Sequence, residues 1–323
     1  MTQIGNQPDR TPHVRVPTSS NPLTNQKMRG TPMRTKIAAV AAIAALALAI
    51  TGCGKAKDDS SNQPKVDKSV SFDAGTKMEA LNKAQSIKIG VKFDQPGLGY
   101  KDPSKSGPVG FDIEIAKIVA AKLGIPADKI QWVETVSKNR EPFLQNGTVD
   151  IVVASYSITD ERKQIVGMAG PYYVTGQQLL VRSDDDSIKG PDDLTGKGVC
   201  SVTGSTSIKT VEEKYGATPK PFGTYSECVQ ALLNKTVDAV TTDGPILLGY
   251  AAQDPDKLKV VGDTFSEERY GIGFAKGDTK FCEFLSTTIK DSFKDGSWEQ
   301  AFKDTLGKAK VDAPKPPTVD ACA

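Results

Sequence analysis

Apolar and polar positions change their period repeatedly along the first half of the chain. Strict alternation is typical of half-buried strands, and apolar residues three or four positions apart are typical of helices. The predicted elements are a strand over 86–91, a helix over 110–123, a strand over 130–133, a short helix over 139–145 and an apolar strand over 149–154. This β-α-β-α-β order predicts a mostly parallel sheet with helices on its faces.

The pattern starts again in the second half. The predicted elements are strands over 198–202, 237–240 and 258–261, helices over 207–215, 225–233 and 246–252, a strand-like segment over 270–274 and two amphipathic helices near 281–293 and 298–306. Two α/β units followed by a late return segment suit two lobes joined by two crossovers. We expect these crossovers near residues 178–182 and 269–273.

The N-terminal region carries an export pattern. The apolar run 37–50 follows Arg34 and Lys36 and is too short and too Ala-rich for a membrane span, so it predicts a secretory signal peptide. Gly52-Cys53 closes the run and resembles the bacterial lipobox. That resemblance implies a lipid on Cys53, although an ordinary signal peptide with an accidental cysteine would look similar.

These patterns divide the chain into consecutive parts. We expect a signal peptide with an N-terminal extension over 1–52, a lipidated cysteine and flexible tether over 53–82, the first part of lobe 1 over 83–180, lobe 2 over 181–268, a return to lobe 1 over 269–308 and a C-terminal tail over 309–323. The polar stretch 54–63 cannot bury enough apolar surface to fold, and the Pro-rich tail is expected to be irregular.

Charge and histidine content exclude several function classes. Residues 1–52 hold six Lys or Arg and one Asp, so their removal leaves 35 basic and 38 acidic side chains and a net charge of −3. This balance gives no sign of a nucleic-acid partner. His13 is the only histidine and is removed with the leader. We therefore expect no cofactor, no metal site built on imidazole and no His-based acid–base chemistry.

Four cysteines remain after Cys53, and an even number outside the cytoplasm indicates disulfides. Three pairings are possible. We favour Cys200–Cys228 and Cys282–Cys322, because each pair falls within one predicted structural unit. The alternative is that the cysteines are free buried thiols, and this alternative has more weight for Cys282 and Cys322 than for Cys200 and Cys228.

The candidate chemistry lies after the predicted strands, where ligands bind in open α/β sheets. Lys92, Arg140 and Arg162 bring three cations to the first unit. In the second unit, the hydroxyl- and Gly-rich turn 203–207 opens a helix, whose N–H groups and dipole favour a carboxylate, and Asp243 adds one anion. Two anion receptors and one carboxylate suit an acidic amino acid.

Longer motifs resemble a known family. GFDIEIA at 110–116, and VDIVVASYSITDER with the following GPYY inside 144–173, resemble the amino-acid-binding family of bacterial solute-binding proteins over 85–308. Residues 92–99 are similar to glutamate-binding lipoproteins of ABC importers. The resemblance implies a type II periplasmic-binding-protein fold, an α/β fold of two lobes whose two crossover strands form a hinge.

The resemblance also implies roles for individual residues. Arg162 matches the arginine that grips the ligand α-carboxylate, and Asp243 matches the acid that pairs with the α-ammonium. The other matched positions are Ser155, Ser157 and Thr206 as ligand contacts, Thr203 in the same loop as Thr206, and Lys92, Ser137 and Arg140 as the side-chain receptor. Relatives that bind aspartate and glutamate often have Arg in place of Lys92, and Lys offers a point charge rather than a fork.

Each role has a simpler alternative. Arg162 would otherwise be a surface salt bridge to Asp160 or Glu161, Asp243 a helix cap, Lys92 and Arg140 solvated rim charges, and Thr203 a turn former.

The expected function is that of an extracytoplasmic solute-binding lipoprotein, a monomer anchored to the cell membrane by its lipid. It would bind L-glutamate, or aspartate next, between its lobes and deliver it to an ABC permease and through that to the ATPase subunits. The alternatives are a binder of glutamine, asparagine or another polar amino acid, or an exported dehydratase on the same fold. We expect no enzyme, because the mature chain has no histidine and the cleft cations match anion binding.

Overall fold

The computed structural model describes residues 63–322 except 310 and 312. The predicted signal peptide, Cys53 and the tether up to residue 62 lie outside the described residues. Within the described part, no helix is long and apolar enough to cross a membrane.

The first lobe is built on a five-stranded sheet with the order β4-β1-β5-β12-β6. Its strands are β1 (Ile87–Val91), β4 (Ile130–Glu134), β5 (Ile151–Val152), β6 (Gly167–Thr175) and β12 (Glu268–Phe274). β1 is parallel to β4 and β5, whereas β12 is antiparallel to β5 and β6. The parallel part is the one that the period-2 and period-3.6 patterns predict.

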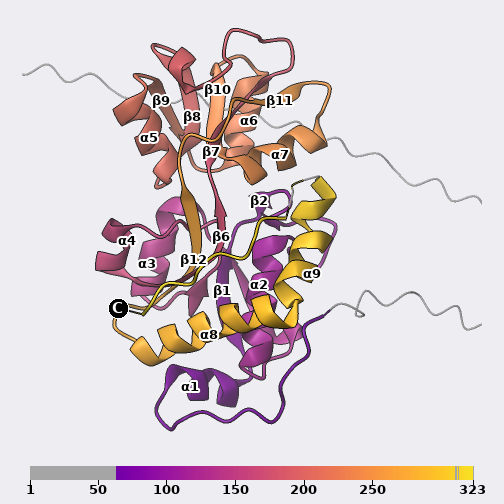
Figure 1. Cartoon of the computed structure of the whole chain (residues 1–323), viewed down its shortest axis with the longest axis vertical. Helices are drawn as coiled ribbons and strands as arrows, with labels where there is room; N and C mark the ends of the chain where they lie inside the picture. Colours follow the sequence, from indigo (N-terminus) through magenta and orange to yellow (C-terminus); the bar gives the residue numbers. More distant parts are fainter. Residues whose placement is uncertain (1–62, 310, 312, 323) are drawn as a thin grey trace, which may run out of the picture. The chain divides into compact units, whose positions relative to one another are not determined.

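Helices cover this sheet, and the last two return to it from the C-terminal part of the chain (Figure 1). They are α1 (Lys77–Ala84), α2 (Phe111–Lys122), α3 (Arg140–Gln145), α4 (Asp160–Ile165), α8 (Thr279–Asp295) and α9 (Ser297–Asp304), with short 3-10 turns η2 (Ala127–Lys129), η3 (Ser137–Asn139) and η5 (Leu306–Ala309) and a small hairpin β2 (Asp94–Gln95) and β3 (Gly99–Tyr100). The core of the lobe centres on the fully buried Phe111 ring, which contacts Tyr172, Tyr173, Trp298 and Phe302 at centroid distances of 5.6–6.0 Å.

The second lobe has its own five-stranded sheet, with the order β11-β7-β10-β8-β9. Its elements are β7 (Gln177–Arg182), η4 (Pro191–Leu194), β8 (Gly198–Val202), α5 (Thr206–Lys214), β9 (Thr218–Phe222), α6 (Tyr225–Leu233), β10 (Ala239–Asp243), α7 (Gly244–Gln253) and β11 (Leu258–Val261). β8 runs parallel to β9 and β10, and β7 is antiparallel to β10 and β11. Helices α5 and α6 therefore begin at the same edge of this sheet.

The two crossovers lie a few residues before the predicted segments. Gly176 alone separates β6 of lobe 1 from β7 of lobe 2, and residues 262–267 lead from β11 into β12. Predicted segments 178–182 and 269–273 are wrong as crossovers, because the first pairs within the sheet of lobe 2 and the second lies within β12, whose register shifts between Tyr270 and Ile272. A Cβ at Gly176 would lie 2.5 Å from the Ser266 carbonyl oxygen, so the two crossovers pack against each other there.

The predicted tether is too long at its C-terminal end. Helix α1 begins inside it, extends two residues beyond it and buries Met78 and Leu81 against the core of lobe 1. Upstream of α1, the Asp67 N–H donates to the Ala121 carbonyl, and Phe72 contacts Phe284 edge-on at 5.6 Å. The segment is polar overall, but it contains a few well-spaced apolar residues whose burial offsets the conformational entropy lost when the segment is ordered.

Beyond η5, which ends at Ala309, the described residues of the C-terminal tail have no helix or strand, as the proline content of the tail predicts. It is nevertheless fixed to lobe 1. The Asp320 N–H donates to the Gly170 carbonyl at 2.7 Å, the Arg269 guanidinium contacts the Asp320 carboxylate at 2.7 Å, and Cys282 and Cys322 form a disulfide. Disulfide and hydrogen bonds thus order a segment that propensity alone leaves irregular.

Candidate functional site

Three neighbouring strand ends form the first-lobe side of the site. β4, β1 and β5 are parallel neighbours, so the residues that follow them meet at one edge of the sheet. Lys92 follows β1, Ser137 lies in η3 after β4, and Ser155 follows β5. All three side chains are buried, and the Lys92 ammonium donates to the Ser137 hydroxyl at 2.7 Å. Strand order therefore brings together groups that are 63 positions apart in sequence.

The Arg140 guanidinium is bound by main-chain carbonyls. Nε donates to Ser137 at 3.1 Å, Nη1 to Ala154 at 3.2 Å and Ser155 at 3.1 Å, and Nη2 to Gly204 at 3.1 Å. A guanidinium has five N–H groups, so these contacts use most of its donors. At 2% exposure Arg140 is not a solvated rim charge. It holds the loops together and brings its positive charge to the cleft.

Arg162 lies in the first turn of α4, which begins after Thr159, whose hydroxyl accepts the Arg162 N–H. The guanidinium donates to the Ser157 carbonyl at 2.6 Å and to the Gly204 carbonyl at 3.1 Å. Its carboxylate partner is Glu141 of α3, at 3.2 Å, rather than an acidic neighbour in α4. Arg162 is therefore held in a buried position and is not a surface ion pair.

Tyr156 supports both arginines with its ring. The guanidinium carbons of Arg140 and Arg162 lie 4.4 Å and 5.0 Å from the ring centroid. Cation–π contacts of this kind strengthen when they are desolvated, and the Tyr156 side chain is fully buried. The ring therefore keeps two like charges close together on one side of the site.

Buried polar groups hold the Ser155 loop in an unusual conformation. Ser155 has a positive φ of 41°, which is uncommon for a residue other than glycine. Its N–H donates to the Asp112 carboxylate at 2.7 Å, and its hydroxyl donates to the Gln95 side-chain oxygen at 3.0 Å. Asp112 also accepts from the Tyr172 hydroxyl at 2.7 Å, and burial raises the pKa of Asp112 to about 6. Strained backbone held this way is a mark of binding sites.

The second-lobe side consists of one helix N-terminus and one strand end. Ser205 caps α5 by accepting the Ile208 N–H, so Thr206 and Ser207 occupy the first turn. Asp243 ends β10 next to the start of α7. Its Oδ2 accepts from the Tyr270 hydroxyl at 2.5 Å, whereas Oδ1 has no hydrogen-bond partner. A buried carboxylate oxygen without a partner indicates a missing donor.

The two lobes touch each other around the site. Gly204 of lobe 2 approaches Lys138 so closely that a Cβ would lie 2.9 Å from Lys138 main-chain atoms, and its carbonyl accepts from both site arginines. On another side, the Asp94 carboxylate accepts the Tyr225 N–H at the start of α6 at 2.7 Å. The described arrangement therefore has the lobes closed.

The lobes enclose a small polar pocket at this point. Its lining consists of Ser137, Arg140, Ser155, Ser157, Arg162, Ser205, Thr206, Ser207, Tyr225, Thr242, Asp243 and Ile246. Seven of the nine predicted site residues are among them. Lys92 lies behind Ser137 and reaches the pocket through that hydroxyl. Thr203 is exposed outside the pocket, and its N–H donates to the Phe222 carbonyl, so its turn-forming role is the one that the structure describes.

Burial shifts the pKa values of two charged groups, Asp243 and Lys92, away from their ordinary values. Desolvation, reinforced by the nearby Glu268, raises the pKa of Asp243 to about 7, although Tyr270 and the two arginines act in the opposite direction. Desolvation and the adjacent Arg140 lower the pKa of Lys92 to about 7, while Asp94 and Asp112 act in the opposite direction. A cation bound at Asp243 would offset the desolvation cost of the ionised carboxylate, and an anion bound near Lys92 would offset that of the charged ammonium.

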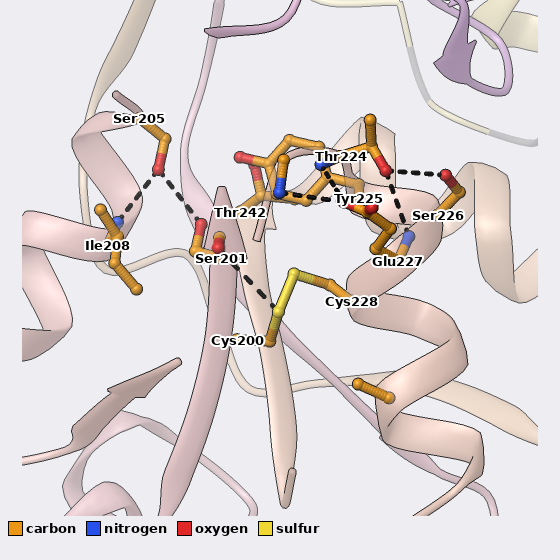
Figure 2. Close-up of a disulfide and its surroundings, with 12 residues drawn as sticks. Cys200, Ser201, Ser205, Ile208, Thr224, Tyr225, Ser226, Glu227, Cys228 and Thr242 are labelled. Carbon is orange, nitrogen blue, oxygen red and sulfur yellow. Dashed lines mark hydrogen bonds between the residues drawn. A yellow bond between two sulfur atoms is a disulfide. The ribbon is translucent and has the colours of Figure 1, made fainter. Parts of the chain in front are cut away.

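A disulfide lies beneath the second-lobe side of the pocket. Cys200 of β8 and Cys228 of α6 are joined, as favoured from the sequence, and both are fully buried (Figure 2). Tyr225 stands one turn before Cys228 on the same helix, and its hydroxyl accepts from Thr242 at 2.7 Å. The disulfide therefore fixes the helix that brings the Tyr225 ring to the pocket.

Sequence reasoning missed several residues of the site. Tyr156, Ser205, Tyr225 and Tyr270 contact the predicted residues or line the pocket, and Glu141 pairs with Arg162. Ser205 had a recognisable signal in its helix-capping position. The tyrosines had none, because their roles depend on packing between elements that are distant in sequence.

Metal ligation has no support in the described part of the chain, where no group of three or more His, Cys, Asp or Glu residues is placed to hold an ion. The donor set of the pocket is made of hydroxyls, guanidinium groups and one carboxylate. Such a set suits a small zwitterion better than a metal ion.

The geometry agrees with a comparison of the sequence with protein families. Residues 87–308 match the bacterial extracellular solute-binding proteins, family 3. The chain belongs to this family. The match covers both lobes and the two crossovers, and all nine predicted ligand-site residues lie inside it.

Relatives in the family differ in the amino acid that their names record. The chain is 37% identical over 288 residues to the glutamate-binding protein GluB of Corynebacterium efficiens, covering 85% of this chain and 92% of that protein. It is also 37% identical over 248 residues to a glutamine-binding protein of Geobacillus stearothermophilus, covering 75% and 93%. An ancestral arginine-binding protein solved with glutamine superposes with a TM-score of 0.65 at 36% identity, covering 69% of this chain and 98% of that one.

Proposed function

We propose that this family member binds L-glutamate, with aspartate second, in the pocket between its lobes and delivers it to an ABC permease. It does so as a monomer anchored by a lipid on Cys53 at the outer face of the cell membrane. Hinge motion at the two crossovers opens and closes the pocket, and ligand shifts the population toward the closed form. Mass spectrometry of protein from membranes tests the anchor, and an unmodified cysteine would contradict it.

The observation that carries the proposal is the separation of charge across the pocket. Two buried arginines face it from lobe 1, and Asp243, with an unpartnered carboxylate oxygen, faces it from lobe 2. The first turn of α5 adds main-chain N–H groups that favour an anion. An amino acid with a second carboxylate complements this arrangement, because its ammonium satisfies Asp243 while its two carboxylates face the cations and the helix.

Calorimetric titration of the delipidated protein with the twenty amino acids tests the proposal. We expect glutamate to bind most tightly, and recovery of unchanged glutamate after denaturation of the complex. No binding of any acidic amino acid would contradict the proposal. A converted product would instead support the exported-dehydratase alternative.

Glutamine is the second candidate, because a glutamine-binding relative is equally identical and because Lys92 stands behind the pocket lining. Lys92→Met therefore tests selectivity. We expect the wild-type preference for glutamate over glutamine to fall by about tenfold, or about 1.4 kcal/mol, because a buried positive charge near the side-chain carboxylate is lost.

The matched control for this change is Lys101→Met, since Lys101 stacks on the Phe93 ring outside the pocket. We expect its ratio of glutamate to glutamine affinity to match that of the wild type. Wild-type protein that prefers glutamine, or an unchanged ratio in Lys92→Met, would place the specificity elsewhere.

Affinity should also depend on pH near neutrality. The ligand ammonium pairs with ionised Asp243, whose pKa is about 7 without ligand, so binding below pH 7 must release a proton and weaken. Above pH 7, Lys92 loses its charge and the anionic side chain loses attraction. We expect a bell-shaped profile, measured by titrations from pH 5 to 9, and loss of its acid limb in Asp243→Asn. A flat profile would contradict both assignments.

A further inference from the structure

Glu268 is a buried carboxylate at the point where the second crossover enters lobe 1. It is the first residue of β12 and is 4% exposed. Its Oε2 accepts a hydrogen bond from the Thr206 hydroxyl at 3.0 Å, and its Oε1 accepts one from the Ser266 hydroxyl at 3.1 Å. The Ser266 hydroxyl in turn accepts the N–H of Gln177, which directly follows the first crossover, at 3.1 Å. Glu268 therefore connects both crossovers to the first turn of α5.

Glu268 lacks the partner that a buried carboxylate usually has. Among the residues that the structure describes, no ion pair includes Glu268, and its hydrogen-bond donors are two hydroxyl groups. Buried carboxylates are normally paired with a cation, because desolvation of an isolated charge is costly. Asp243 lies close enough to interact with Glu268, and the Oδ1 atom of Asp243 has no hydrogen-bond donor. A positive charge bound near these two carboxylates would therefore be stabilised by both of them.

We propose that Glu268 is a positioning residue of the ligand-ammonium site, which turns the Thr206 hydroxyl proton away from the pocket and adds its negative charge to that of Asp243. This inference rests on the proposed function in assuming an amino-acid ligand, and it does not depend on which amino acid binds. It assigns to the hinge strand a direct electrostatic influence on the pocket.

The hydroxyl chemistry of Thr206 gives the first consequence. A hydroxyl has one proton and two lone pairs, and here the proton goes to Glu268. Thr206 lines the pocket, so its oxygen offers acceptors to the ligand and not a donor. The role that the resemblance implies for Thr206, contact with a carboxylate, then falls to its main-chain N–H at the start of α5.

The charge around Asp243 gives the second consequence. Tyr270 donates to it from β12, Tyr225 of α6 and Tyr173 of β6 lie near it, and Arg140 and Arg162 face it across the pocket. Both arginines lower the pKa of Asp243, whereas Glu268 raises it. Removing the negative charge of Glu268 while keeping its shape should therefore make Asp243 more acidic.

Glu268→Gln tests this by the pH profile of amino-acid affinity. We expect the acid limb to move to lower pH by about half a unit or more, because Asp243 ionises more readily without a neighbouring anion. Glu267→Gln is the matched control, since the adjacent Glu267 side chain is 72% exposed. We expect its acid limb to stay within about 0.2 units of the wild type. A Glu268→Gln profile that superposes on the wild type would overturn the role of Glu268.

Carbon NMR of the wild-type carboxyl groups provides a test that needs no folded variant. Without ligand, the Glu268 signal should shift as Asp243 titrates near pH 7, because coupled groups report each other's charge. A Glu268 signal unchanged from pH 5 to 8 would overturn the inference. The ligand for the affinity test is whichever amino acid the calorimetric titration selects. Failure of every amino acid to bind contradicts the proposed function, whereas binding with an unmoved acid limb contradicts only the role of Glu268.

Discussion

Arg162→Ala should weaken glutamate binding by roughly 2–5 kcal/mol, which corresponds to a dissociation constant raised from about 30-fold to several thousandfold. Truncation leaves the ligand α-carboxylate buried without its charged partner, and the cost of that unpaired group dominates the effect. Arg162 is 8% exposed and is fixed by Ser157, Gly204 and Glu141, so the bound ligand meets a preorganised group. Calorimetry at constant pH and ionic strength measures the change.

Two variants separate the guanidinium fork from simple charge. Arg162→Lys keeps the charge without bidentate geometry and should recover only part of the loss. Lys209→Ala removes an exposed cation that contacts Glu161 at 3.4 Å, and its effect should stay within about twofold. An Arg162→Ala affinity within about tenfold of the wild type would contradict this placement of the α-carboxylate.

The sequence predicts the parts of the site that depend on strand order. Lys92, Ser137 and Ser155 meet because each follows a parallel strand, and a βαβ pattern is enough to predict such an edge. Asp243 follows from the same rule in the second sheet. The place of the two arginines in the site was also predictable, because cations that follow such strands can bind an anionic ligand.

Features set by packing between distant segments could not be predicted in the same way. The position of Lys92 behind Ser137 depends on the conformation of the loop that contains Lys92. The stacking of two arginines on Tyr156 depends on helices from separate parts of the chain. The predicted crossovers lie a few residues too late in the sequence, because the pairing of β7 and β12 begins earlier than the local alternation of apolar residues indicates. The order of residues 63–82 depends on a few apolar contacts that a polar composition conceals.

Glu268 illustrates the limit most clearly. In the sequence it is one of two adjacent glutamates before an aromatic residue, and nothing local distinguishes it from Glu267. The structure buries Glu268 at the start of β12 and exposes Glu267, which is the last residue of the crossover that leads into this strand. The predicted strand starts at residue 270, two residues late, and therefore leaves Glu268 outside it.

Loss of the Cys200–Cys228 disulfide should have the second large effect, this time on stability. Replacing both cysteines with alanine should lower the free energy of unfolding by roughly 3–4 kcal/mol, because the disulfide closes a loop across a separation of 28 residues and restricts the unfolded chain. For a protein of this size, that corresponds to a melting temperature lower by on the order of 10 °C. Differential scanning calorimetry measures it.

The position of this disulfide adds an effect on binding. Cys228 lies one turn after Tyr225, which lines the pocket and donates its N–H to the Asp94 carboxylate. A looser α6 should therefore also weaken ligand affinity by about threefold to tenfold. The matched control removes Cys282 and Cys322, whose disulfide pins the tail to α8 away from the pocket. That control should lose stability and keep wild-type affinity. Equal affinity losses in the two double variants would show that destabilisation in general, and not the anchoring of α6, reduces binding.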